Sequence, residues 1–130
     1  MKENKPYLVF LVEDDKFYLE ILESYFGSKK NFETKRFLTA QECEENLHLQ
    51  PDLVILDYFL DKYDANAPDG KWMYKKIQER CPKAKIIIVS AQQSASVVFG
   101  LVKEGVRNYI MKDKETFEEL DSLLEEYAWI

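Results

Sequence analysis

Short apolar runs alternate along the chain with stretches whose apolar residues recur at helical spacing, and this alternation predicts the fold. Four runs predict strands within a parallel sheet, because they are short, almost wholly apolar and bounded by polar residues. A fifth run, residues 32–38, alternates with charged residues, which suits a sheet edge. The four other expected strands are residues 7–12, 52–57, 85–89 and 106–111.

Helices are predicted after each strand. Their apolar positions span residues 17–26, 40–47, 72–77, 97–102 and 117–127. Gly27 and Gly105 stand where the first and fourth helices end, and capping boxes beginning at Thr39 and Thr116 open the second and fifth. Repeated strand–helix alternation predicts an α/β fold, a doubly wound parallel sheet with helices on both faces in three layers.

Polar side chains follow the expected strands at the points where they end. Asp57 closes the third strand, Glu13 and Asp14 follow the first, Ser90 follows the fourth, and Lys112 follows the fifth. The carboxyl ends of parallel strands meet at one edge of a sheet, where ligands bind in open α/β folds. These five side chains are therefore expected to converge.

Three carboxylates at one sheet edge repel each other, and a divalent cation relieves that repulsion. Magnesium prefers hard oxygen ligands and suits a site of one to three carboxylates. With Lys112 and Ser90 nearby, such a site complements the charge of a phosphoryl group. Asp57 is then the expected nucleophile, since carboxylates form acyl phosphates.

Taken in order, four features resemble the receiver domain of two-component response regulators, of the chemotaxis-regulator type. They are Glu13-Asp14, the lone Asp57 at the end of a buried strand, Ser90-Ala91, and Tyr109 three residues before Lys112. The resemblance implies a flavodoxin-like five-stranded sheet in the order 2-1-3-4-5 with five helices. It also implies that residues 1–130 form a single receiver domain with a core of about residues 6–127.

The resemblance further implies a role for each site residue. Asp57 would accept a phosphoryl group from a histidine kinase or a phosphotransfer protein, and Ser90 and Lys112 would bind its oxygens. Magnesium would be held by Glu13, Asp14, Asp57 and the backbone carbonyl of Phe59. Tyr109 would be the aromatic switch, although plain core packing is an equal interpretation of this residue.

The implied output is protein interaction rather than catalysis. A downstream protein would bind the face formed by the fourth helix, fifth strand and fifth helix, and that face is also a candidate homodimer surface. We expect no enzyme activity beyond self-phosphorylation and slow autodephosphorylation. The chain ends at Ile130, so a stand-alone receiver and a fragment of a longer regulator both remain as interpretations.

Two departures from the family pattern stand out. Asp113 follows Lys112 where the family commonly has proline, so a cis peptide bond is not expected there. The loop from Tyr58 to Asp69 is longer than usual and carries three acids, Asp61, Asp64 and Asp69. These acids are expected to form a solvated surface in preference to a second metal site.

Charge and composition exclude other classes. A net charge of −6 argues against direct binding of nucleic acid, and no apolar stretch is long enough to span a membrane. Cys43 and Cys81 share no metal-ligand spacing and are expected to be reduced and at least partly buried. Together these features point to the cytoplasm. His48, the lone histidine, is expected at the surface, away from the strand ends.

Two rival hypotheses remain. The long loop from Tyr58 to Asp69 and the residue Asp113 motivate the hypothesis of a receiver-like interaction module that does not depend on phosphorylation. An enzyme with an aspartyl intermediate is disfavoured, because such enzymes usually carry a second acid two residues after the nucleophile, where this chain has Phe59. Asp15 is expected to cap the first helix rather than to bind metal.

Overall fold

The computed structural model shows a five-stranded parallel sheet in the order β2-β1-β3-β4-β5. It describes residues 4–60, 68–91 and 95–130. The predicted fold class and strand order are confirmed. The strands are β1 (Tyr7–Val12), β2 (Phe32–Phe37), β3 (Leu53–Leu56), β4 (Lys85–Ser90) and β5 (Tyr109–Met111).

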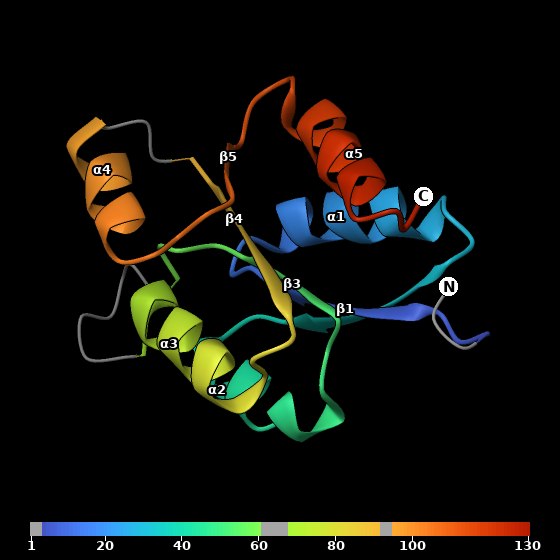
Figure 1. Ribbon diagram of the computed structural model, residues 1–130, viewed down its shortest axis with the longest axis horizontal. Helices are drawn as coiled ribbons and strands as arrows, with labels where there is room; N and C mark the ends of the chain where they lie inside the picture. Colours follow the sequence, from blue (N-terminus) through green and yellow to red (C-terminus); the bar gives the residue numbers. More distant parts are fainter. Residues whose placement is uncertain (1–3, 61–67, 92–94) are drawn as a thin grey trace.

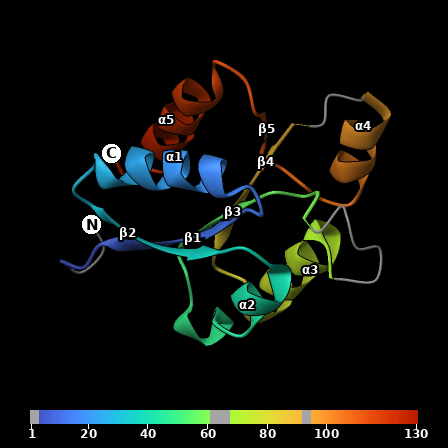
Figure 2. The same ribbon diagram turned by 180° about the vertical axis from the view of Figure 1, so that it is seen from behind.

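Helices cover both faces of the sheet (Figure 1). Figure 2 shows the same layers from behind, with α1 and α5 on one face and α2 and α3 on the other. Alternate residues of β1 point to opposite layers: Val9 and Leu11 pack with α1 and α5, whereas Phe10 and Val12 pack with α2 and α3. The helices are α1 (Lys16–Gly27), α2 (Ala40–Glu44), α3 (Gly70–Arg80), α4 (Ala95–Lys103) and α5 (Thr116–Glu126).

Two elements are shorter than the apolar pattern predicts. The second helix ends at Glu44, and Leu47 belongs to a separate 3-10 helix, η1 (Leu47–Leu49). The last strand begins at Tyr109 rather than Val106, because the Val106 N–H turns back to the Leu101 carbonyl at 3.0 Å after Gly105 ends α4 in the left-handed region. Leu47 and Val106 are both buried, so the apolar pattern identified these core residues correctly. It did not identify the secondary structure of their backbone.

The helix starts test the expected caps. Asp15 caps α1 by accepting from the Phe17 N–H at 3.0 Å, and Thr39 caps α2 by accepting from the Glu42 N–H at 3.1 Å, as predicted. The prediction of a second capping box at Thr116 is wrong. Thr116 is already inside α5, and its hydroxyl bonds the turn before the helix.

The remaining expectations concern burial. Cys43 and Cys81 are both buried, and His48 is exposed. Trp129 lies beyond the expected core boundary yet stacks on Tyr7 with a ring-centroid distance of 4.1 Å. Within residues 4–60, 68–91 and 95–130, no helix is both long and apolar enough to cross a membrane.

Candidate functional site

The backbone hydrogen bonds of the sheet continue past the ends of β1 and β3 and place Glu13 and Asp57 side by side. The Asp57 N–H donates to the Val12 carbonyl at 2.9 Å, and the Glu13 N–H donates to the Phe37 carbonyl at 3.1 Å. Both backbones are therefore held by the strands that precede them. The two side chains emerge at the carboxyl edge of the sheet, which is where the sequence places them.

Glu13, Asp14 and Asp57 form a compact acidic cluster. One carboxylate oxygen of each residue lies within 4.8 Å of the others. Glu13 is 2% exposed and Asp57 8% exposed, whereas Asp14 is half-buried. Burying carboxylates so close together is unfavourable unless positive charge compensates them.

Lys112 supplies part of that compensation. Its ammonium Nζ lies 2.5 Å from Glu13 Oε1 and 3.6 Å from Asp57 Oδ2. The same nitrogen lies 4.5 Å from the centroid of the Tyr18 ring. A ladder bond from the Lys112 N–H to the Ser90 carbonyl, at 2.8 Å, places the side chain beside the acids.

One cation does not balance the cluster. Burial raises the pKa of Glu13 to about 8, the Asp57 charge acts in the same direction, and Lys112 opposes both. Burial alone lowers the pKa of Lys112, but the hydrogen bond to Glu13 and the charge of Asp57 outweigh it, so this pKa is raised overall. The cluster therefore has an excess of negative charge that a second, divalent cation would relieve.

Backbone N–H groups orient the two buried acids. The Phe59 N–H donates to Asp57 Oδ1 at 3.0 Å, and the Asp15 N–H donates to Glu13 Oε2 at 3.2 Å. These bonds leave Asp57 Oδ2 facing Lys112. The expected role of the Phe59 carbonyl as a metal ligand stays a prediction.

Ser90 ends β4 and Tyr109 begins β5, so both come from the same side of β3 as Lys112. Ser90 is buried at the end of β4. Burial raises the pKa of Tyr109, a hydrogen bond with Ser90 lowers it, and the charge of Asp57 raises it. The Tyr109 hydroxyl therefore meets Ser90, and Tyr109 also lines a groove beside α4.

Thr116 was missed as a residue that shapes the site. Its buried Oγ1 donates to the Met111 carbonyl at 2.6 Å and accepts from the Asp113 N–H at 2.8 Å. The hydroxyl thereby ties the start of α5 to the turn that carries Lys112. The peptide bond between Lys112 and Asp113 is trans, as the missing proline predicted.

A second missed contact joins the loop after Asp57 to α4. Tyr58 Oη donates to Glu104 Oε2 at 3.0 Å, and Lys71 Nζ lies 2.9 Å from Glu104 Oε1. No sequence motif signals this contact, because the three residues are distant along the chain. Of the long loop's acids, Asp69 caps α3 through the Trp72 N–H at 2.9 Å, and Asp61 and Asp64 lie outside the described residues.

The donor set at the sheet edge fits magnesium. Magnesium takes carboxylate oxygens and keeps several waters, so it does not need a closed cage of protein ligands. The three clustered carboxylates offer such oxygens, and burial together with the charge of Asp57 raises the pKa of Glu13. The described site can therefore hold a hard divalent cation beside a reactive carboxylate.

Comparison with known proteins places this geometry in a family. A sequence model described as the response regulator receiver domain matches residues 9–125. The probable C4-dicarboxylate response regulator DctR of Halalkalibacterium halodurans is 32% identical over 123 residues, which is 92% of this chain and 50% of that protein. The chemotaxis protein CheY of Thermotoga maritima is 25% identical over 115 residues, 87% of this chain and 92% of that protein.

Solved structures agree on the fold. A chain in the crystal structure of the CheX-CheY-BeF3-Mg+2 complex from Borrelia burgdorferi superposes with a TM-score of 0.76 at 23% identity, covering 95% of this chain and 90% of that one. The chain spans about half the length of the two DctR regulators it matches. The family match over most of the sequence decides the assignment: the chain belongs to the response regulator receiver domains of two-component systems.

Proposed function

We propose that the chain is a phosphorylation-dependent switch in which Asp57 accepts a phosphoryl group from a histidine kinase or a phosphotransfer protein. One observation carries the proposal. The buried Asp57 carboxylate shares the carboxyl edge of the sheet with two more acids, and the Lys112 ammonium reaches both Glu13 and Asp57. This arrangement provides a nucleophile, a cation site and a fixed positive charge in one place.

The transfer step is a substitution at phosphorus. Asp57 Oδ2 attacks, because Oδ1 already accepts the Phe59 N–H. A P–O bond to the carboxylate forms, the P–N bond of the donor phosphohistidine breaks, and the imidazole nitrogen keeps that electron pair. Lys112 and Ser90 donate hydrogen bonds to the phosphoryl oxygens and stabilise the charge that they carry.

Magnesium is the proposed cofactor. The carboxylates of Glu13, Asp14 and Asp57 and the backbone carbonyl of Phe59 would hold it. When bound, the ion supplies positive charge that offsets the repulsion between the acids and an incoming phosphoryl group.

Output would pass through the face formed by α4, β5 and α5. A groove of about 590 Å³ lies there, and its lining includes Phe99, Val102 and Tyr109. Phe99 is 65% exposed and Val102 60% exposed, so this groove is an apolar surface available for contact. Because Tyr109 bonds Ser90 and also lines the groove, a phosphoryl group at Asp57 would shift the balance between two groove shapes.

The proposed partners follow from this surface. A downstream protein or a second copy of the chain would bind the groove, and neither nucleic acid nor a membrane would bind this domain directly. We place the chain in the cytoplasm as a single receiver domain, and we expect it to turn over no external substrate beyond its own phosphate.

The experiment is intact-mass spectrometry after incubation with acetyl phosphate and magnesium. The wild type should gain one phosphoryl group, Asp57→Asn none, and chelation of magnesium should suppress the gain. Asp15→Asn is the matched control, since Asp15 caps α1 beside the site and asparagine is an equally good cap. An equal gain in wild type and Asp57→Asn removes Asp57 from its role.

The rival module would behave differently. If the wild type gained no mass and its spectrum did not respond to beryllofluoride with magnesium, an interaction module independent of phosphorylation would be the better interpretation. Steady release of phosphate from small phosphomonoesters would instead revive the enzyme hypothesis.

A further inference from the structure

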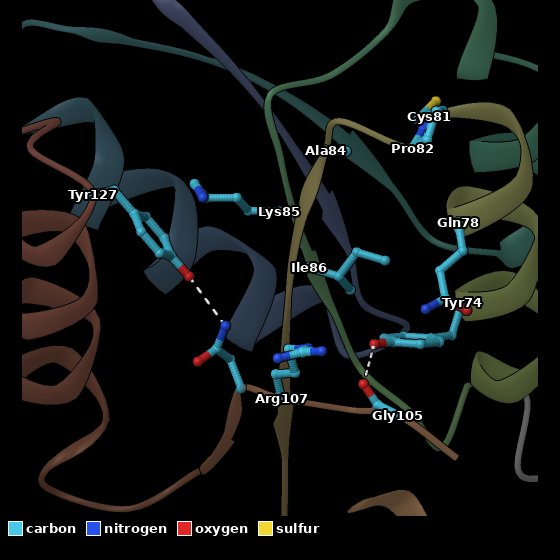
Figure 3. Close-up of a pocket in the computed structure, with 11 residues that line it drawn as sticks. Tyr74, Gln78, Cys81, Pro82, Ala84, Lys85, Ile86, Gly105, Arg107 and Tyr127 are labelled. Atoms are coloured by element: carbon cyan, nitrogen blue, oxygen red, sulfur yellow. Dashed lines mark hydrogen bonds between the residues drawn. The ribbon is translucent and has the colours of Figure 1, made fainter.

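A cavity of about 410 Å³ opens at the amino ends of β4 and β5 (Figure 3). Lys85 is the first residue of β4, and Arg107 and Asn108 directly precede β5. Asp57 follows the carboxyl end of β3, so this cavity and the acidic cluster lie at opposite edges of the sheet. The cavity is therefore separate from the proposed phosphorylation site.

The charge of the cavity is opposite to that of the whole chain. Its lining includes the cations Lys85 and Arg107, and no carboxylate among the described residues. Neither cation forms an ion pair with any residue in the described ranges, and the Lys85 ammonium lies 4.4 Å from the centroid of the Tyr127 ring instead. In a chain of net charge −6, two cations without acidic partners at one cavity favour an anionic ligand.

The walls of the cavity are held by hydrogen bonds. On one side the Asn108 side-chain amide donates to Tyr127 Oη at 3.2 Å, and on the other Tyr74 Oη donates to the Gly105 carbonyl at 3.3 Å. In Figure 3 the Ile86 side chain extends from β4 toward Tyr74, whereas Lys85 extends toward Tyr127. Ile86 and the Tyr74 ring therefore form one apolar wall beside the cations, which suits a flat, partly apolar ligand.

The volume limits the size of the ligand. Small-molecule sites commonly measure about 300–1,000 Å³, so this cavity suits one compact molecule. We propose that it binds a small organic anion, a flat ring that carries a phosphate or carboxylate group. The ring would pack on Ile86 and Tyr74, and the anionic group would meet Lys85 and Arg107.

The test is a ¹H–¹⁵N NMR titration in the absence of magnesium with four probes: AMP, 4-hydroxybenzoate, adenosine and inorganic phosphate. At least one ring anion should shift the amides of residues 84–86 and 105–108 in a saturable way. Adenosine and inorganic phosphate should each bind at least about tenfold more weakly than the ring anion. Adenosine lacks the anionic group, and inorganic phosphate lacks the ring. Comparing the affinities of AMP and 4-hydroxybenzoate shows whether the site prefers a phosphate or a carboxylate as the anionic group.

Variants locate the site. The double substitution Lys85→Gln with Arg107→Gln should weaken binding of the ring anion about tenfold or more, since it removes both charged donors. Lys35→Gln, at an exposed cation on the edge strand β2, is the matched control and should bind as the wild type does. Asp57→Asn should also bind normally, so failure of the proposed phosphorylation leaves this test intact.

Two results would overturn the proposal. One is the lack of saturable shifts with both ring anions. The other is a set of shifts that survives the double substitution, or that maps to the residues around Asp57 and Lys112, which would mean that the probe binds the acidic edge instead.

Discussion

Thr116 offers the sharpest test of how this chain positions Lys112 without the usual proline. Its buried hydroxyl donates to the Met111 carbonyl at 2.6 Å and accepts from the Asp113 N–H at 2.8 Å. The same hydroxyl also donates to the Asp113 carbonyl at 2.9 Å. Thr116→Val keeps the shape of the side chain and removes all three bonds. We expect the turn from Lys112 to α5 to loosen and the folded state to lose stability.

The expected loss comes mainly from the Met111 carbonyl and the Asp113 N–H, because the Asp113 carbonyl still accepts from the Thr116 N–H at 3.4 Å. A buried polar group without a partner costs about 1–3 kcal/mol. Asp113 is exposed, so water replaces part of the lost bond at its N–H, and we expect a total of about 2–3 kcal/mol. A loss of that size lowers the melting temperature of a domain of this length by roughly 6–15 °C.

Urea denaturation of wild type, Thr116→Ser and Thr116→Val measures the effect. Serine keeps the hydroxyl and loses a buried methyl group, so it should cost only about 1 kcal/mol. Ser122→Ala is the matched control, because the Ser122 hydroxyl bonds a carbonyl of its own exposed helix surface. If valine proved as stable as serine at position 116, the hydroxyl would not be what holds the turn.

Two further predictions concern the loop after Asp57. A Cβ at Gly70 would overlap the backbone of Tyr58, so Gly70→Ala should lower the unfolding free energy by about 2 kcal/mol or more in urea denaturation. Gly27→Ala, where a Cβ meets nothing, should be neutral or stabilising by about 0.5–1 kcal/mol, and equal losses in both would contradict the packing argument. The hydrogen bond to Lys71 lowers the pKa of Glu104, with the Tyr58 hydroxyl acting in the same direction, so their contact should hold at neutral pH and be lost as the pH falls through this lowered pKa. NMR shifts of the Tyr58 ring would report the loss, and an unchanged titration in Glu104→Gln would refute it.

The fold was predictable because most core strands of a parallel sheet are unmistakable in sequence. β1 has the expected bounds, since its apolar run is flanked by polar residues on both sides. The buried face of α4 was harder to predict. The sequence offers four apolar positions for it, Val97, Val98, Leu101 and Val102, yet within α4 only Leu101 is buried. Four apolar residues cover a wider arc than one buried face, and periodicity alone does not tell which of them the sheet covers.

The strand ends were predictable for the same reason as the strands. Parallel topology brings together every residue that follows a strand, so Glu13, Asp57 and Lys112 needed no further signal. Thr116 was misread because a hydroxyl followed three residues later by an acid is also the pattern of a capping box. Whether such a hydroxyl caps its own helix or bonds the turn before it depends on backbone direction, which the pattern does not contain.

The same limit explains why the link from Asp57 to α4 had to come from the structure. α4 buries Leu101 and packs Val97 against the core, and Glu104, the residue after its end, meets Tyr58, the neighbour of Asp57. On the opposite side, Tyr109 joins Ser90 to the groove beside the same helix. A helix with so little burial responds to small changes in its polar attachments. In the proposed switch, a phosphoryl group at Asp57 would therefore act on α4 from two sides, and the exposed apolar groove would be the surface that changes.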